Sequence, residues 1–180
     1  MNILFRVDSS SKIGLGHVMR CLVLAKQYKE DNVVFATQDL KGNANQKIID
    51  ESYKLIALND GSVDELIQRI NELNIDMVVF DHYGINSDFE KAIKNTSGVK
   101  ILSFDDIYEK HYCDILLNHN VYADVSKYKD LVPDFCEVRC GEKYTLVRDE
   151  FKKIKIKKKS ADKDKTVIFI CLGGSDAKNI

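Results

Sequence analysis

The sequence predicts an α/β fold built on a doubly wound parallel sheet, and three features of the chain lead to this prediction. Apolar segments of strand length alternate with segments of helical period along most of the chain. Apolar segments such as Met77–Phe80 lack polar alternation, which is typical of parallel strands covered on both faces. The first strand leads through Gly14 and Gly16 into a helix, an arrangement that turns backbone N–H groups toward an anion.

The individual elements follow from these patterns. The expected strands are Asn2–Val7, Val33–Thr37, Lys54–Leu58, Asp76–Asp81, Lys100–Phe104 and Asp114–Leu117. The expected helices are His17–Glu30, Ala44–Ser52, Ser62–Leu73 and Ser87–Asn95. In the third helix Ser62 is the predicted N-cap, with Glu65 completing a capping box. In the first helix Arg20 lies roughly opposite the apolar face.

The chain divides into three parts by composition. Residues 1–150 are expected to form one Rossmann-like domain that carries the glycine turn and the candidate catalytic residue. The lysine-rich segment 151–165 is interpreted as a solvated linker, because acidic residues follow the lysines and aromatics are not interleaved. Residues 166–180 resemble the first strand and glycine turn of a second domain, so we expect the chain to be part of a longer protein.

Composition excludes several classes of protein. The net charge of −1 gives no argument for a nucleic-acid or anionic-membrane partner. No apolar run reaches the roughly 18–20 residues of a membrane span, and the first strand starts without a signal peptide. We therefore expect a soluble, cytoplasmic protein.

The five cysteines are odd in number and scattered, which predicts reduced thiols. The pair Cys136 and Cys140 has no second cysteine or histidine pair at the interval that a zinc site requires.

His17 is the candidate general base. It follows Gly16 at the expected start of a helix, where the helix dipole favours a neutral ring, although a bound diphosphate would act in the opposite direction. The alternative is that His17 only caps the helix or packs in the turn. The two preceding glycines, and Arg20 one helical turn later, favour the catalytic interpretation.

Other candidates follow the carboxyl ends of the expected strands, where ligands bind in such sheets. Asp81 and Tyr83 either hold sugar hydroxyls and amides or serve as capping and surface residues, and the sequence leaves both interpretations open. Asp105 and Asp106 are adjacent, so they point to opposite faces, and only one is expected to face the cleft. The turn lacks the third glycine of a dinucleotide site and the Gly-Lys-Ser/Thr of a Walker loop.

Several motifs together resemble the nucleotide-sugar hydrolases of pseudaminic acid biosynthesis. They are Arg6-Val-Asp8-Ser-Ser, Gly14-x-Gly16-His17-Val-Met-Arg20, Val79-Phe-Asp81-His-Tyr83-Gly, Phe104-Asp-Asp106, Leu117-Asn118, Gly141-x-x-Tyr144-x-Leu-x-Arg148-x-Glu-Phe151 and Gly173-Gly174-Ser175-Asp176. The resemblance implies the N-terminal domain of a two-domain GT-B fold, similar to the peptidoglycan N-acetylglucosaminyl transferase. It also implies cleavage of UDP from UDP-2,4-diacetamido-2,4,6-trideoxy-β-L-altropyranose, with His17 activating the water and with no metal or cofactor.

The same resemblance implies which residues bind the UDP-sugar substrate and the UDP product. The substrate-binding candidates are Gly14, Leu15, Gly16, Arg20, Asp81, Tyr83, Arg148, Gly174 and Ser175. Two alternatives remain open: a glycosyltransferase that uses a UDP-sugar donor and a sugar or lipid acceptor, and a non-catalytic nucleotide-binding module. We expect a monomer that binds neither nucleic acid nor membrane.

Overall fold

The computed structural model describes residues 1–152 and residue 168. The chain forms two compact units, Met1–Leu146 and Val147–Ile180. In the second unit the described part contains the short helix α5 (Asp149–Lys152). Most of the predicted linker 151–165, and the predicted strand and turn at 166–180 apart from residue 168, lie outside the described residues.

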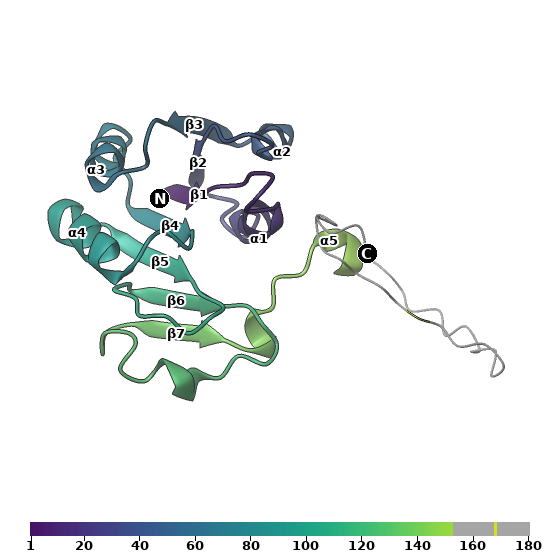
Figure 1. Ribbon diagram of the computed structural model, residues 1–180, viewed down its shortest axis with the longest axis vertical. Coiled ribbons are helices and arrows are strands. Elements are labelled where there is room, and N and C mark those ends of the chain that lie inside the picture. The colour runs from purple at the N-terminus through teal and green to yellow at the C-terminus, as the bar shows by residue number, and fades with distance from the viewer. Residues whose placement is uncertain (153–167, 169–180) are drawn as a thin grey trace. The chain divides into compact units, whose positions relative to one another are not determined.

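The first unit contains a seven-stranded, fully parallel sheet (Figure 1). Its strands are β1 (Asn2–Val7), β2 (Asn32–Gln38), β3 (Lys54–Leu58), β4 (Met77–Asp81), β5 (Lys100–Phe104), β6 (Ile115–Asn118) and β7 (Glu137–Cys140). The strand order β3-β2-β1-β4-β5-β6-β7 confirms the predicted doubly wound, Rossmann-like sheet. The sequence did not indicate β7, because this edge strand is half-exposed and its four residues, Glu-Val-Arg-Cys, contain no apolar run.

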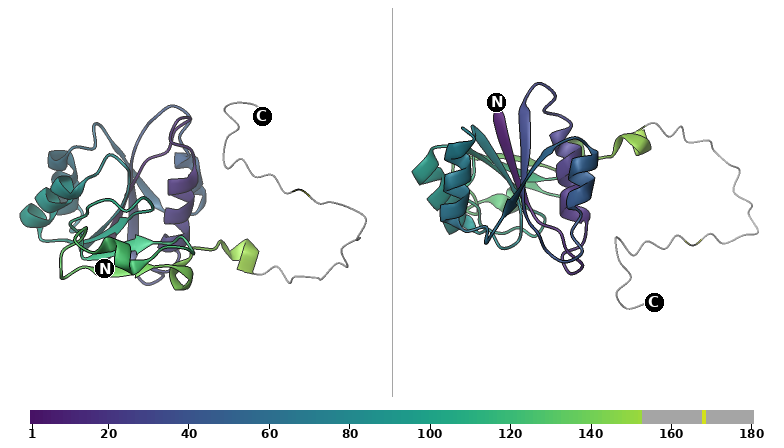
Figure 2. Two further views of the ribbon diagram at one scale, coloured as in Figure 1. Left: turned by 60° about the horizontal axis from the view of Figure 1, so that its bottom comes forward. Right: turned by 90° about the horizontal axis from the view of Figure 1, so that it is seen from above.

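Four helices cover the two faces of the sheet. They are α1 (Gly16–Ala25), α2 (Asn45–Asp50), α3 (Val63–Glu72) and α4 (Ser87–Ser97), with short 3-10 turns at η1 (Val125–Tyr128) and η2 (Glu142–Tyr144). Figure 2 shows α1 and α2 on one face and α3 and α4 on the other. None of the described helices is both long and apolar enough to cross a membrane.

Each face of the sheet has its own apolar core, and β1 contributes to both. Phe5 joins the core under α1 and α2 and stacks on Phe35 with ring centres 5.0 Å apart. Leu4 points to the other face and joins the core that contains Leu66 and Ile93 from α3 and α4. Complete burial of such side chains contributes roughly 1.5–3 kcal/mol each. The central strand is therefore fixed from both sides.

Local signals set most helix boundaries, and two predicted helices are too long. Helix α1 ends at Ala25 instead of Glu30, because the next polar residues form tight i→i−3 bonds, including Tyr28 N–H to Ala25 carbonyl at 3.0 Å, before β2 begins. The helix predicted at Ala44–Ser52 shortens to α2. The Ser62 cap is confirmed, since its Oγ accepts a 3.3 Å bond from the Glu65 N–H. The predicted capping box is wrong in its second bond: the Glu65 carboxylate accepts from the N–H groups of residues 59–61, and the Ser62 N–H donates to Asp60 Oδ1 at 2.8 Å.

The strand order places the topological switch point of the sheet beside α1. Strand β1 lies between β2 and β4, and the chain leaves β1 and β4 toward opposite faces of the sheet. The carboxyl ends of β1 and β4 thus flank the topological switch point, which is where open α/β sheets bind ligands.

Candidate active site

The turn between β1 and α1 is organised by Ser10. Its carbonyl accepts a 2.8 Å hydrogen bond from the Gly14 N–H, and its Oγ accepts bonds from the N–H groups of Lys12 and Ile13. Gly14 adopts φ +85°, a conformation that favours glycine. This local bonding turns the chain directly into the start of α1.

The first turn of α1 is open to a ligand. Helix α1 has no side-chain cap and no acidic residue in its first turn. Met19 is the first residue whose N–H is bonded within the helix, to the Leu15 carbonyl at 3.0 Å, and among the described residues the N–H groups from Leu15 to Val18 have no partner. A Cβ placed on Gly14 or Gly16 would meet nothing within 4 Å. The predicted anion-facing turn therefore has both free donors and free space.

His17 is held by a buried carboxylate. Its Nδ1 lies 2.6 Å from Oδ1 of Asp81, the last residue of β4, and Asp81 is 1% exposed. An ionised carboxylate can only accept hydrogen bonds, so Nδ1 carries the hydrogen and Nε2 is the acceptor of the neutral ring. Among the described residues Nε2 has no hydrogen-bond partner. This arrangement prepares His17 to take a proton at Nε2.

Arg20 fixes the same carboxylate from the other side. Its Nε donates to Asp81 Oδ2 and its Nη2 to Oδ1, both at 2.6 Å, which is a bidentate pair. The Cys21 thiol adds a 3.5 Å contact to Oδ2. Burial acts to raise the pKa of Asp81, but the hydrogen bonds from Arg20 and His17 hold it below its ordinary value. Asp81 is thus an ionised and fully bonded anchor.

The remaining guanidinium nitrogen of Arg20 reaches the next strand. Arg20 Nη1 donates to Asp106 Oδ2 at 2.8 Å and lies 3.4 Å from His119 Nε2. Asp106 also accepts a 3.1 Å bond from the Tyr83 hydroxyl, and the Tyr83 ring meets the His17 ring edge-on with centres 4.8 Å apart. Arg20 therefore links the carboxyl ends of β4, β5 and β6 in one network.

The network carries an excess of negative charge. The guanidinium of Arg20 faces the two carboxylates of Asp81 and Asp106. Burial, followed by the positive charge of Arg20, lowers the pKa of His119, so the ring adds no positive charge near neutral pH. One cation against two anions leaves about one negative charge beside His17. Such a site favours the development of positive charge and disfavours a phosphate placed against the carboxylates.

A second buried ion pair fixes the neighbouring strand ends. Asp8, which follows β1, accepts bonds of 2.6 and 2.9 Å from Arg6 and a 2.8 Å bond from the Gln38 N–H at the end of β2. His82 Nε2, after β4, lies 3.2 Å from the same carboxylate. Burial opposes ionisation, but the bonds from His82 and Arg6 lower the pKa of Asp8. This cluster ties three strand ends together beside the His17 network.

The structure brings the side chains of four predicted site residues together, directly after the glycine turn. His17, Arg20, Asp81 and Tyr83 form one cluster at the end of the glycine turn. The side chain of Leu15 packs on the core, which leaves its backbone for a ligand. Arg148 belongs to the second unit, where its guanidinium lies 4.8 Å from the Phe151 ring centre. Gly174 and Ser175 lie outside the described residues.

Two members of the cluster were incompletely identified from sequence. The sequence predicted that only one of the adjacent acids belongs to the site. In the structure Asp106 bonds Arg20, whereas Asp105 bonds Tyr128 and lies near His111. His119 was not singled out as a site residue. Its position directly after β6, at the carboxyl edge of the sheet, was the available signal.

Comparison with known proteins gives three relatives, whereas no family model matches the chain. The chain is 50% identical over 181 residues to the UDP-2,4-diacetamido-2,4,6-trideoxy-beta-L-altropyranose hydrolase of Campylobacter jejuni, covering 100% of this chain and 63% of that protein. It is 31% identical to an uncharacterized protein of Methanocaldococcus jannaschii and 25% identical to the spore coat polysaccharide biosynthesis protein SpsG of Bacillus subtilis, in each case over 100% of this chain. The chain spans 38% and 52% of those two proteins.

Proposed function

We propose that the protein is a UDP-sugar hydrolase of pseudaminic acid biosynthesis. It releases UDP from UDP-2,4-diacetamido-2,4,6-trideoxy-β-L-altropyranose by attack of water at the anomeric carbon, with His17 as general base. The observation that carries the proposal is the 2.6 Å bond between His17 Nδ1 and the buried Asp81, which leaves Nε2 as the proton acceptor. The 50% identity to the Campylobacter hydrolase supports the choice of substrate.

The base works through its carboxylate partner. As water attacks, Nε2 of His17 takes its proton and the ring becomes an imidazolium. Asp81, 2.6 Å from Nδ1, stabilises that positive charge and holds the ring in one orientation. Arg20 keeps Asp81 in place with two 2.6 Å bonds, so Arg20 acts on the reaction through Asp81.

The charge of the site suits cleavage at the sugar carbon. Departure of UDP leaves positive charge on the anomeric carbon, and the negative excess of Asp81 and Asp106 over Arg20 stabilises it. The same carboxylates repel a diphosphate, which instead finds donors at the open N–H groups of the Gly14–Gly16 turn. Leu15 contributes its backbone there. In the proposal Gly174 and Ser175 of the second glycine turn, together with Arg148, also bind the UDP part.

Tyr83 is the proposed wall of the sugar subsite. Its side chain is 60% exposed, although its hydroxyl is held by Asp106 and its ring edge by His17. A ring fixed at both ends and exposed on its remaining surface offers an apolar contact for the methyl groups of the substrate's two acetamido substituents.

UDP is a good leaving group, so the proposed reaction uses no metal or cofactor. We also propose that the protein acts in the cytoplasm as a monomer.

Isotope labelling of the reaction tests the proposal. The gene product that contains this chain is incubated with the UDP-sugar in ¹⁸O-labelled water without an acceptor. Release of UDP with the label in the sugar, and none in the phosphate, is the expected result. Label in UDP would show attack at phosphorus, and UDP release only after addition of an acceptor would show a transferase. Either result overturns the proposal, and the His17→Asn variant provides the background rate.

A further inference from the structure

Two cysteines at the amino ends of β6 and β7 lie in contact with each other. Cys113 is two residues before β6 and Cys136 directly precedes β7, and their Sγ atoms are 3.7 Å apart. Cys113 is fully buried, whereas Cys136 is partly exposed. We propose that Cys113 and Cys136 are a dithiol site that hydroperoxides oxidise to a reversible intramolecular disulfide. This inference is independent of the proposed hydrolase activity.

The two sulfurs have unequal roles in the contact. The hydrogen bond from the Cys113 thiol, opposed by burial and assisted by the Leu116 N–H, lowers the pKa of Cys136. The same bond, together with burial, raises the pKa of Cys113 well above its ordinary value. The more exposed sulfur is therefore the one that ionises first, and the buried one keeps its proton to higher pH. This is the order that a peroxide, arriving from solvent, requires.

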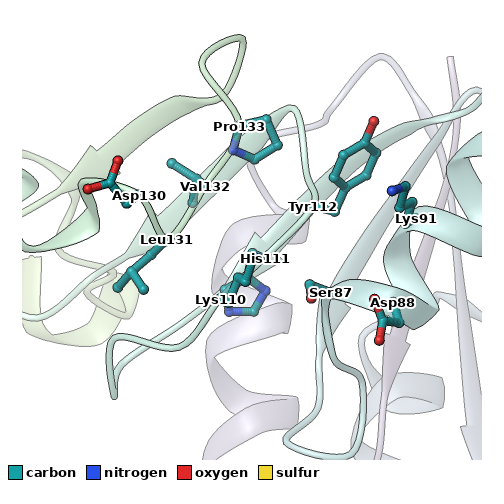
Figure 3. Close-up of a pocket in the computed structure, with 10 residues that line it drawn as sticks. All are labelled: Ser87, Asp88, Lys91, Lys110, His111, Tyr112, Asp130, Leu131, Val132 and Pro133. Atoms are coloured by element: carbon teal, nitrogen blue, oxygen red, sulfur yellow. The ribbon is translucent and has the colours of Figure 1, made fainter.

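The charged groups around Cys136 act on its pKa in opposite directions. The segments that lead into the two cysteines, Lys110–Tyr112 and Asp130–Pro133, line a pocket of about 320 Å³ on the α4 side of the sheet (Figure 3). His111 lies in this pocket between Glu90 at 2.8 Å and Asp105 at 3.8 Å. Burial acts to lower its pKa, but the bonds to Asp105 and Glu90 raise it to about 9. His111 is thus a cation at neutral pH and lowers the pKa of Cys136 by Coulomb attraction, whereas the larger effect of the Asp114 carboxylate raises that pKa.

The chemistry balances in two steps. The Cys136 thiolate attacks one oxygen of hydrogen peroxide, the O–O bond breaks, and hydroxide leaves while Cys136 becomes a sulfenic acid. The Cys113 sulfur then attacks the sulfenic sulfur, the S–O bond breaks, and the Cys113 proton and the hydroxyl leave as water. The two thiols lose two electrons and the peroxide gains them. Closing the 3.7 Å gap to bonding distance needs movement of about 1.7 Å, which side-chain rotation and small backbone shifts supply.

The disulfide would link the edge strand β7 covalently to the rest of the sheet. Strand β7 is the outermost strand and pairs with β6 alone, in the register Ile115↔Glu137. A bond between Cys113 and Cys136 lies just before that register begins. It therefore joins the two strands at their amino ends and closes the loop between them, which restrains the unfolded chain. We expect the oxidised protein to melt at a higher temperature than the reduced one.

Peptide mapping tests the site directly. The folded protein is treated with hydrogen peroxide, alkylated, and cleaved with trypsin, which places Cys113 in peptide 111–127 and Cys136 in peptide 130–139. The expected product is these two peptides joined by a disulfide, 2 Da lighter than their sum, with separation on reduction. Recovery of both peptides fully alkylated overturns the proposal, as does a cross-link of Cys136 to Cys140 or to another chain.

Matched serine variants separate the pair from the other thiols. Cys136→Ser should abolish the cross-link, whereas Cys140→Ser, four residues along the same segment, should leave its yield unchanged. Circular dichroism first establishes that each variant is folded. If Cys136→Ser does not fold, the roles of the two cysteines are tested instead by comparing their alkylation rates in the folded wild-type protein. Cys136 must react faster than Cys113, and the reverse order overturns the assignment of roles.

Discussion

Replacing Asp81 by asparagine removes the charge on which His17 and Arg20 converge while keeping nearly the same shape. Asp81 accepts from His17 Nδ1 and Arg20 Nη2 at Oδ1, and from Arg20 Nε at Oδ2, each at 2.6 Å. The amide of asparagine has only one acceptor oxygen. Its least costly orientation keeps that oxygen on His17 and Nη2 and turns the NH₂ group against the Nε–H of Arg20, which loses its bond.

The size of the effect follows from that single lost bond. A charge-assisted hydrogen bond contributes about 1.5–3 kcal/mol, and breaking a buried ion pair costs about 3–5 kcal/mol. Because Asp106 still bonds Arg20 at 2.8 Å, we expect a loss of about 2–3 kcal/mol in unfolding free energy. The imidazolium of the transition state loses its counter-charge, so kcat should fall by about 10²- to 10⁴-fold.

Urea denaturation and steady-state UDP release measure the two effects on one preparation. Asp106→Asn is the matched control, since its side chain is 20% exposed and shares only the Nη1 end of Arg20. We expect that variant to lose less than about 1 kcal/mol and less than about tenfold in kcat. If Asp81→Asn keeps both kcat and stability within the range of Asp106→Asn, the assignment of Asp81 as partner of the base is refuted.

Further changes test other parts of the structure. His17→Asn should lower kcat by about 10²- to 10⁴-fold with little change in UDP affinity, and an equal loss of both would make His17 a ligand. The Cβ of Gly16→Ala meets open space, so this variant should keep the unfolding free energy or raise it by up to about 1 kcal/mol. Its KM for the UDP-sugar should rise. Gly14→Ala, at φ +85°, should instead lower the unfolding free energy by about 1 kcal/mol. Because the folded-state pKa of His111 is about 9 against 6.5 unfolded, its contribution is complete below pH 6.5 and is lost as the pH rises through 9. Urea unfolding should show a fall of up to about 3 kcal/mol over that interval, and the double variant Glu90→Gln, His111→Gln should lack it.

Most of the sheet could be predicted because each buried strand is a continuous apolar run in the sequence. The apolar run of β4 and the start of β1 match the predicted boundaries within a residue, since strands buried on both faces need continuous apolar sequence. Strand β7 could not be predicted in this way. Its four half-exposed residues form a strand because β6 offers a free edge, and that edge exists only once the sheet has assembled.

The sequence indicated most residues of the candidate site, but it did not indicate the hydrogen bonds between them. The glycine turn, His17 and Arg20 are within seven residues of each other, so their proximity follows from the sequence. Asp81 is 64 residues from His17, and only the pairing of β1 with β4 brings its carboxylate to 2.6 Å. The fold directs the three nitrogens of Arg20 to Asp81 and Asp106, which the sequence did not indicate, and the contact of Arg20 with substrate stays a prediction.

The amino-acid order alone determined the layered α/β class, the glycine turn and the position of the imidazole at the head of a helix. These are consequences of periodicity and of backbone conformation, which act over a few residues. The tertiary structure decided which nitrogen of the His17 ring is free, which of the two neighbouring acids bonds Arg20, and which thiols touch. Those outcomes depend on strand order and register, because only the assembled sheet sets the distances between groups that lie far apart along the chain.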